Sequence, residues 1–360
     1  MSRTETFRPD WVSPPGETIA DILRERNVSV DDFARQISHT TEQTADLLTG
    51  RLAITIALAR RLKQVLGGSV QFWMSRDFQY REPKTRAKIS SDERDWLQAL
   101  PVADMVRFGW LSPARSPSER LSACLTFFRV PNVGAWHRNY ATLERKFSFR
   151  ASPSFKSSPA ALATWLCRGE IESEEINCAP WNAEGFASSL TKIRTLTLEK
   201  DPRQFLPKLQ QLCAENGVAV AIIRAPNGCR ASGATRFTTS DKAMLLLSFR
   251  HLSDDQFWFS FFHETAHLLL HNHRELFIEG EGIPSSQAEM EANEFAARTL
   301  IPLARKDDLL RLRQSALAIA RFAQRIGVSP GIVVGQLQHY GKVRPSHFNG
   351  LKRRYTWEQD

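Results

Sequence analysis

Cysteine is scarce in this chain of 360 residues, and its spacing fits neither a disulfide framework nor a redox motif. The five cysteines are scattered at positions 124, 167, 178, 213 and 229, and no two of them form a C-x-x-C pair. Such a distribution is typical of reduced thiols, most of them packed in the core of a cytosolic protein. We therefore expect no disulfide to hold this fold together.

Long hydrophobic runs are also missing. No run of 18 apolar residues occurs, which argues against a membrane-spanning helix. The first eight residues lack the hydrophobic core of a secretory signal. These absences favour a cytoplasmic location without a membrane partner. The length allows two or three domains, and the net charge of +9 permits nucleic-acid binding without proving it.

One motif carries clear chemistry, the sequence His263-Glu264-Thr265-Ala266-His267. Histidines four residues apart share one face of a helix, so both imidazoles can reach one Zn²⁺ at about 2.0–2.1 Å. Glu264 would then lie beside the open coordination position, where it can accept a proton from a water molecule. The H-E-x-x-H pattern therefore predicts a zinc peptidase site with Glu264 as its base.

The neighbouring sequence places this motif on a helix. An apolar stretch of strand length, residues 243–249, precedes it. Ser253 and Gln256 have the spacing of a capping box, and the two acidic residues between them suit the positive end of a helix dipole. We expect a long apolar helix from Phe257 to about His271.

A catalytic zinc site needs a third protein ligand, and the candidates lie on a second predicted helix that ends before Pro302. Glu289 and Asn293 share one face of this helix with two alanines, which allow close packing against the first helix. We predict Glu289 as the third ligand and Asn293 as the group that orients an imidazole. Glu291 points about 160° away from Glu289, at roughly 100° per residue, and is the weaker candidate.

The residues around the motif resemble the ImmA/IrrE family of gluzincin-type metallopeptidases. The resemblance rests on residues 257–271, on Glu289-x-x-Ala292-Asn293-x-Phe295-Ala296, on Leu300-Ile-Pro302, and on residues 233–236, 247–250 and 332–338. It implies a zinc endopeptidase that cuts a protein partner, often a transcriptional repressor. By position it makes His263, His267 and Glu289 the metal ligands and Glu264 the catalytic base. Thr265 departs from the family pattern, which usually has a small apolar residue or Leu there.

The N-terminal part carries the signature of a helix-turn-helix. Residues 15–67 have apolar positions at helical spacing, and Thr40 can cap a third helix that Gly50 ends. Two short helices joined by a three-residue turn form this motif. Residues 15–23, 38–51, 54–55, 59–62 and 67–73 resemble the Xre/HigA-type helix-turn-helix family. The resemblance implies binding to double-stranded operator DNA through the third helix, and often a homodimer.

The first residues of a recognition helix face the major groove. Here the candidate base contacts are Thr41, Gln43 and Thr44, because Gln can bond adenine and Thr can touch either base or a methyl group. Arg51 is a candidate phosphate contact. Glu42 would accept from cytosine or repel phosphate, so we expect modest affinity unless the domain dimerises. A helix-turn-helix fold reused for protein contact is the alternative.

The sequence predicts a mostly helical α+β protein. We expect an Xre-type helix-turn-helix bundle over residues 1–83 and a helical connector or sensor region, without a catalytic motif, over 84–200. An ImmA/IrrE-like zinc peptidase core with a small gluzincin-like sheet should occupy 201–304, followed by a helical extension over 305–360 that packs on it. Strands are expected at 218–224, 235–239 and 243–249.

Two functions from different classes fit these features. The first is a DNA-binding transcriptional regulator whose zinc-dependent endopeptidase cleaves a repressor or another regulatory protein, such as a toxin-system partner. The second is an antitoxin-like autorepressor whose zinc site is structural or sensory. An intact Glu264 favours the first, because a structural site needs no base. The candidates for stabilising the oxyanion are Arg250, His271, His273 and Tyr340.

Overall fold

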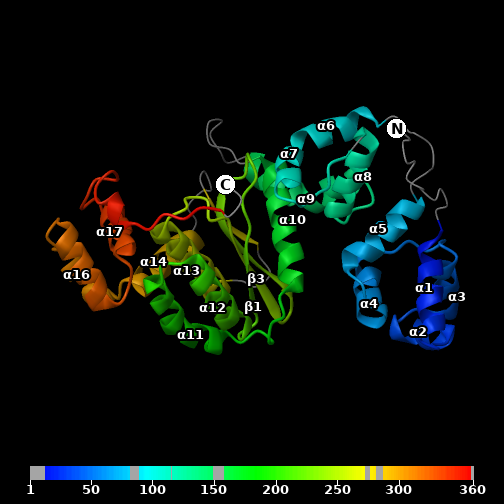
Figure 1. Ribbon diagram of the computed structural model, residues 1–360, viewed down its shortest axis with the longest axis horizontal. Helices are drawn as coiled ribbons and strands as arrows, with labels where there is room; N and C mark the ends of the chain where they lie inside the picture. The colour runs from blue at the N-terminus through cyan, green and yellow to red at the C-terminus, as the bar shows by residue number, and fades with distance from the viewer. Residues whose placement is uncertain are drawn as a thin grey trace, which may run out of the picture. The chain divides into compact units, whose positions relative to one another are not determined.

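The computed structural model describes residues 13–81, 89–114, 116–148, 158–271, 276–280 and 287–357. The chain divides into two compact units, one made of Met1–Gln98 with Met105–Asn139 and the other of Ala99–Asp104 with Tyr140–Asp360. The described residues are mostly helical, and the second unit holds a four-stranded mixed sheet (Figure 1). The predicted α+β class is confirmed, whereas the helix-turn-helix arrangement and the gluzincin-like detail remain predictions.

Five helices open the first unit around a small apolar core. They are α1 (Pro15–Glu25), α2 (Val30–Gln36), α3 (Thr41–Leu48), α4 (Ile56–Leu66) and α5 (Val70–Arg81). Ile19, Phe33 and Trp73 are fully buried between them. The predicted cap of α3 is confirmed, because the side chain of Thr40 accepts from the backbone N–H of Gln43 at 3.1 Å. Gly50 follows α3 with a φ of 75°, a conformation that favours glycine.

The next helices place tryptophans in a cluster of rings. These helices are α6 (Ser91–Ala99), α7 (Val102–Arg107), α8 (Pro117–Phe127) and α9 (Val133–Ser148). In the first unit the ring of Trp96 lies 5.9 Å from that of Phe128 and 5.7 Å from that of Trp136. All three side chains are buried, so these tryptophans stabilise the core.

The sheet of the second unit has the strand order β1-β3-β2-β4. Its strands are β1 (Val218–Ile222), β2 (Ala231–Thr239), β3 (Lys242–Leu247) and β4 (Phe277–Gly280). β1 pairs with β3 in parallel, while β2 pairs antiparallel with β3 and β4. The three predicted strands are present with shifted ends. β4 was not predicted, because four residues are too few to show alternation.

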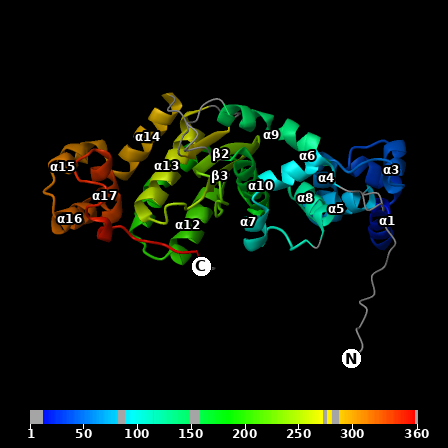
Figure 2. The same cartoon turned by 90° about the horizontal axis from the view of Figure 1, so that it is seen from above.

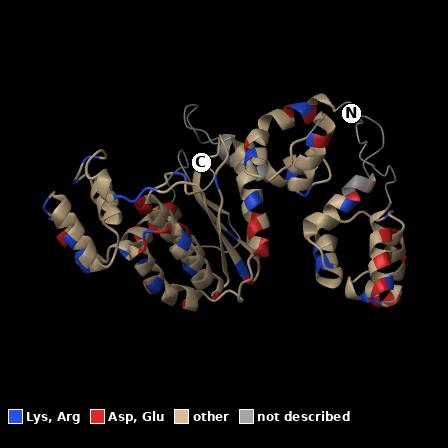
Figure 3. Cartoon of the chain, in the orientation of Figure 1, with Lys and Arg blue, Asp and Glu red and all other residues tan. Residues whose placement is uncertain are grey.

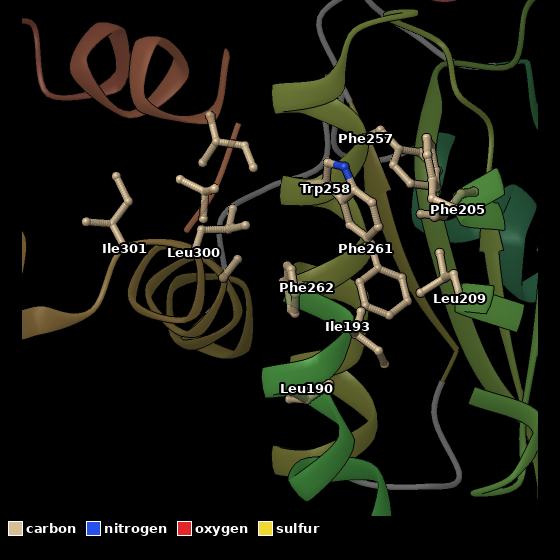
Figure 4. Close-up of a cluster of buried hydrophobic side chains, with 14 of the residues drawn as sticks. Leu190, Ile193, Phe205, Leu209, Phe257, Trp258, Phe261, Phe262, Leu300 and Ile301 are labelled. Carbon is tan, nitrogen blue, oxygen red and sulfur yellow. The ribbon is translucent and has the colours of Figure 1, made fainter. Parts of the chain in front are cut away.

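Helices cover both faces of this sheet. α10 (Pro159–Glu175) lies on one face, and α12 (Pro202–Ala214) and α13 (Asp254–Leu270) lie on the other, as two perpendicular views show (Figure 2). α11 (Ala183–Thr195) and α14 (Gln287–Leu300) complete the surroundings of α13. Figure 4 shows this core, with Leu190, Ile193, Phe205, Leu209, Phe257, Trp258, Phe261, Phe262, Leu300 and Ile301 labelled. Residues 183–200, expected to form part of a connector, therefore share the core of the predicted peptidase domain.

The acidic start of α13 is tied to the C-terminal extension. Ser253 is the N-cap residue but makes no side-chain cap hydrogen bond, so the predicted capping box is wrong. Asp254 is buried and accepts from the hydroxyl of Ser329 at 2.6 Å and from the backbone N–H of Arg353 at 3.0 Å. Nζ of Lys352 lies 2.7 Å from Oδ2 of the buried Asp255. These partners fix the N-terminal end of the helix that carries the motif.

The extension consists of short helices packed in the second unit. They are η3 (Leu303–Arg305), α15 (Lys306–Leu310), α16 (Ala316–Ile326), α17 (Pro330–His339) and η4 (Asn349–Leu351). Gly331 of α17 allows close approach to α13, because a Cβ there would lie 2.2 Å from Oδ1 of Asp254. Among the described residues no single helix is long and apolar enough to cross a membrane. α16 and α17 pass that test only as a pair bent by 110°, on length and composition alone.

Candidate metal centre

α13 and α14 bring two imidazoles and a carboxylate to one point. Nε2 of His263 lies 3.1 Å from Nε2 of His267 and 3.1 Å from Oε2 of Glu289. Nε2 of His267 lies 3.4 Å from Oε1 of Glu289. The two histidines are 1% and 2% exposed, so the three donor groups meet below the surface.

These distances fit a tetrahedral metal ion. Zinc bonds of about 2.0–2.1 Å place the ligand atoms of a tetrahedron roughly 3.3–3.4 Å from one another. Nε2 of His263 lies 3.1 Å from Nε2 of His267, and the contacts of the two histidines with Glu289, at 3.1 and 3.4 Å, reach its two different oxygens. One ligand atom from each of the three residues lies within 4.8 Å of the other two. Two imidazole nitrogens, one carboxylate and a fourth position without a protein ligand form the donor set of a catalytic zinc ion. The residues present therefore fit Zn²⁺.

Asn293 lies beside the first imidazole. Ala292 and Ala296 are fully buried, which lets α14 approach α13 closely. Oδ1 of Asn293 lies 3.0 Å from Nδ1 of His263. When Nδ1–H donates to this amide oxygen, the lone pair of Nε2 faces the convergent donors. The structure thus places Asn293 where the helical-face argument put it.

His267 is oriented by a relay that the sequence analysis missed. Nδ1 of His267 lies 2.9 Å from Nδ1 of His271, and Nε2 of His271 lies 3.1 Å from Oε2 of Glu291. One proton arrangement satisfies every contact, with Nδ1–H of His267 donating to His271 and Nε2–H of His271 donating to Glu291. The sequence held a signal for this relay, since positions 263, 267 and 271 repeat every four residues.

We expect His271→Ala to weaken zinc binding by roughly 10- to 100-fold, because the imidazole of His267 loses its orienting acceptor. His271→Asn should recover part of this loss, since its amide oxygen can replace Nδ1 as acceptor. Chelator competition with the full chain measures both affinities. His347→Ala, at an exposed histidine, is the control. Equal affinity in all four proteins would show that the relay does not hold His267.

The other candidates for the oxyanion do not converge on the site. Arg250 donates to the backbone carbonyl of Arg230 at 2.9 Å, and the ring of Tyr340 lies 5.1 Å from Nζ of Lys306. His271 lies behind His267, on the side away from the convergent Nε2 atoms. His273 lies outside the described residues. No oxyanion role is therefore assigned to these residues.

Glu264 is completely buried beside the two histidines. Its Oε2 accepts from the hydroxyl of Thr235 at 2.9 Å, while Oε1 has no hydrogen-bond partner among the described atoms. β2 approaches so closely that a Cβ on Gly233 would lie 2.4 Å from Oε1. Burial raises the pKa of Glu264 well above its usual range, although His263 and the hydroxyl of Thr235 oppose the shift. Its carboxylate therefore has a high affinity for a proton.

A second acid near the site, the half-buried Glu279, comes from β4. Its Oε2 is buried without a hydrogen-bond partner among the described atoms. Burial raises the pKa of Glu279, while the charge of His263 and a hydrogen bond from Ser260 lower it. Sequence analysis missed this residue because it missed β4, whose pairing with β2 carries the side chain to the site.

The charges of the three donor groups make zinc binding depend on pH. Burial would lower the pKa of His263, but the hydrogen bond to Glu289 and the nearby carboxylates outweigh it and raise the pKa to about 9. Burial alone would raise the pKa of Glu289, but the hydrogen bond from His263 and the positive charge of that imidazole hold it at about 2. The pKa of His267 is lowered, mainly by burial. In the metal-free protein at neutral pH, His263 is therefore protonated and His267 is neutral.

Zinc must displace the proton of His263, so each zinc ion bound at pH 7 should release about one proton. We expect the dissociation constant to fall about tenfold per pH unit between pH 7 and 9 and to level off above pH 9, where His263 is already neutral. Calorimetric zinc titrations in buffers of different ionisation enthalpy measure the proton count. Release of no proton at pH 7 would contradict the charge assigned to His263.

The candidate DNA contacts of α3 are only partly available. Thr44 is fully buried and donates to the backbone carbonyl of Thr40 at 2.9 Å, so its prediction as a base contact is wrong. Thr41 and Gln43 are exposed, but Oε1 of Gln43 already accepts from the backbone N–H of Thr40 at 3.0 Å. Nε of the exposed Arg51 lies 2.9 Å from Oδ1 of Asp46. Figure 3 shows that the N-terminal helices around α3 carry acidic as well as basic residues.

Two comparisons with known proteins agree with these features. The family described as IrrE N-terminal-like domain, peptidase M78, matches residues 217–337, from the start of β1 into α17. The N-terminal part is 39% identical over 61 residues to an uncharacterized HTH-type transcriptional regulator, YddM, of Escherichia coli (strain K12). That match covers 17% of this chain and 65%, less than two thirds, of the relative's own length. An HTH-type segment joined to an IrrE/ImmA-type domain is thus confirmed, whereas the Xre/HigA-type and gluzincin-type details remain predictions.

Proposed function

Because this chain joins a segment similar to an HTH-type regulator to an IrrE/ImmA-type domain, we propose that it is a DNA-binding regulator with a zinc-dependent endopeptidase that cleaves a regulatory protein. The observation that carries the proposal is the convergence of His263, His267 and Glu289 within 3.1–3.4 Å, with a buried carboxylate beside them. The catalytic base is Glu264, and the metal ligands are the three convergent residues.

Zn²⁺ held by this donor set supplies Lewis-acid chemistry, polarising a carbonyl and lowering the pKa of a water molecule. Glu264 accepts the proton of the attacking water on Oε1, the oxygen that has no hydrogen-bond partner among the described residues, while Thr235 holds Oε2 in place. The raised pKa of Glu264 suits this task, because a carboxylate with a high proton affinity can take the proton and pass it to the leaving amine.

An extended segment of the substrate protein would bind along β4. This strand is last in the order of the described sheet, so its outer edge can pair with a peptide backbone. Phe277 of β4 stacks on the ring of His267, with 4.2 Å between ring centroids. A peptide paired with this edge would therefore run beside the metal ligands.

The second candidate function, an antitoxin-like autorepressor with a structural or sensory zinc site, has weaker support. A structural site is closed by four protein ligands and needs no base. Among the described residues three ligands converge, and the carboxylate beside them has an oxygen without a hydrogen-bond partner in that part of the chain. That oxygen favours a reaction with a water molecule over a purely structural role.

A trapping experiment tests the proposed activity. The full chain with Glu264→Gln should retain its substrate protein, because binding persists while cleavage stops. The captured protein, incubated with the zinc-loaded wild type, should be cut at a defined bond that mass spectrometry identifies. If zinc-loaded wild type leaves every captured protein intact, the site is not proteolytic.

The N-terminal helices are proposed to bind an operator as a dimer, with Gln43 reading a base and Arg51 contacting phosphate. Arg51→Ala should weaken binding to all duplexes alike. It should also reduce the slope of log affinity against log salt concentration by about one, since one phosphate contact is lost. Gln43→Ala should remove on the order of 1–3 kcal/mol of binding free energy and relax the sequence preference at one base pair, leaving the other positions unchanged. Selection from randomised duplexes with the full chain checks both. A dimeric protein that enriches no sequence at low salt would instead use this surface for protein contact.

A further inference from the structure

A cavity of about 270 Å³ lies behind the metal centre, between α14 and the C-terminal extension. Its walls come from the last turns of α14, from η3 and α15, and from the end of α17. The cavity is smaller than most drug-sized sites, which span roughly 300–1,000 Å³. Its volume is enough for a small molecule that consists of a single ring and one polar head group.

Two cations border this cavity without a carboxylate partner. Nζ of Lys306 lies 5.1 Å from the ring centroid of Tyr340, and Cζ of Arg298 lies 5.4 Å from that of Phe295. Neither cation forms an ion pair with any residue in the part of the chain that the structure describes. The acid that lines the cavity, Glu294, is exposed. The two cations therefore leave the cavity with an excess of positive charge that would attract an anionic head group.

The remaining walls are apolar or carry amides. Ile301 and Leu309 are buried and Leu303 is 71% exposed, so apolar surface lies open beside the cations. Asn293 and Gln336 also line the space. A nucleic-acid strand would need cations spaced along a surface, whereas here two cations share one small cavity. The lining instead matches an apolar body that carries a single anionic group.

Asn293 connects this cavity to the metal centre. Asn293 is one of the residues that line the cavity, and its Oδ1 accepts from Nδ1 of His263 at 3.0 Å. A ligand that accepts from the amide N–H would polarise the amide and make Oδ1 a stronger acceptor. A stronger acceptor raises the basicity of the imidazole and hence its affinity for a metal ion.

We propose that this cavity is a binding site for a small organic anion, a carboxylate or phosphate on a ring-sized apolar body, and that its occupancy strengthens metal binding through Asn293. Such a site would let a small molecule control the metal centre from a place that the substrate does not occupy. Both effects are measured as binding, so the proposal stands or falls separately from the peptidase activity.

The first test measures probe binding to the full chain by calorimetry. Phenyl phosphate, inorganic phosphate and phenol are titrated into zinc-free protein, so that the metal cannot hold the anion. We expect phenyl phosphate to bind at least about tenfold more tightly than either fragment. Lys306→Gln and Arg298→Gln should each weaken it about tenfold or more, as the loss of a charge-assisted hydrogen bond predicts. Arg305→Gln is the matched control, because Arg305 pairs with Asp308 and does not line the cavity.

The second test measures coupling. Chelator competition with and without phenyl phosphate should show zinc held roughly fivefold more tightly when the probe is bound, and zinc should tighten the probe by the same factor. Asn293→Ala should reduce this ratio to one, whatever it does to either affinity alone. Circular dichroism of each variant verifies that the fold is kept.

Several outcomes would overturn the proposal. Failure of every probe to bind at millimolar concentration would exclude an organic-anion site. Equal binding to wild type, Lys306→Gln and Arg298→Gln would place the probe elsewhere. Inorganic phosphate binding as tightly as phenyl phosphate would mean an adventitious ion only. Probe binding without any effect on zinc would remove the link through Asn293.

Discussion

Glu289→Ala is expected to leave the purified protein almost free of zinc under conditions in which the wild type holds one ion per chain. In the proposed site three of the described residues would hold the metal, and the contacts between their ligand atoms are 3.1–3.4 Å long, with Glu289 offering a different oxygen to each histidine. Removing Glu289 leaves a site of two histidines. The loss of zinc affinity should therefore exceed the roughly 10- to 100-fold loss expected when a group that only orients a ligand is removed. Metal analysis after dialysis against a weak chelator measures it.

Two neighbouring glutamates on α14 serve as controls. Glu294→Ala removes an exposed carboxylate and should keep full zinc occupancy. Glu291→Ala removes the last group of the relay through His271 and should weaken zinc moderately. If Glu291→Ala loses the ion while Glu289→Ala keeps it, the third ligand has been assigned to the wrong residue.

The candidate metal centre could be located from the sequence because its geometry is local. Spacing of four residues places His263 and His267 on one helical face wherever the helix lies. The same periodicity on the second helix singled out Glu289 and Asn293, and two alanines indicated which face packs inward. Only the contact between the two helices joins residues far apart in the sequence, and the small residues on α14 indicated that one of its faces packs closely.

Residues delivered by long-range contacts could not be found in this way. Glu279 reaches the site because β4 pairs with β2, about forty residues earlier in the chain, and a four-residue strand leaves no periodic pattern. The sequence indicated for Asp254 only that it suits the start of a helix, whereas in the fold it is buried and accepts hydrogen bonds from Ser329 and Arg353 of the extension. Thr44 looked like a recognition residue, but the packing of α3 turned it inward.

Glu264→Gln should retain zinc and the fold but lose about 100- to 10,000-fold in the rate of peptide-bond cleavage. Glutamine has nearly the same shape as glutamate and can keep the hydrogen bond from Thr235, but it cannot accept a proton. The range is what a positioned general base contributes. Because Glu264 belongs to none of the three pairs of convergent donor atoms, its loss should leave metal content unchanged.

The measurement is single-turnover cleavage of the substrate protein captured by the trap, with zinc content determined on the same samples. Glu294→Gln, a matched change on an exposed glutamate, should cleave at the wild-type rate. Thr235→Val should lie between the two, since it keeps the carboxylate but removes the hydroxyl that holds Oε2. If zinc-loaded Glu264→Gln cleaves at the wild-type rate, Glu264 is not the catalytic base, because glutamine cannot accept the proton of the attacking water.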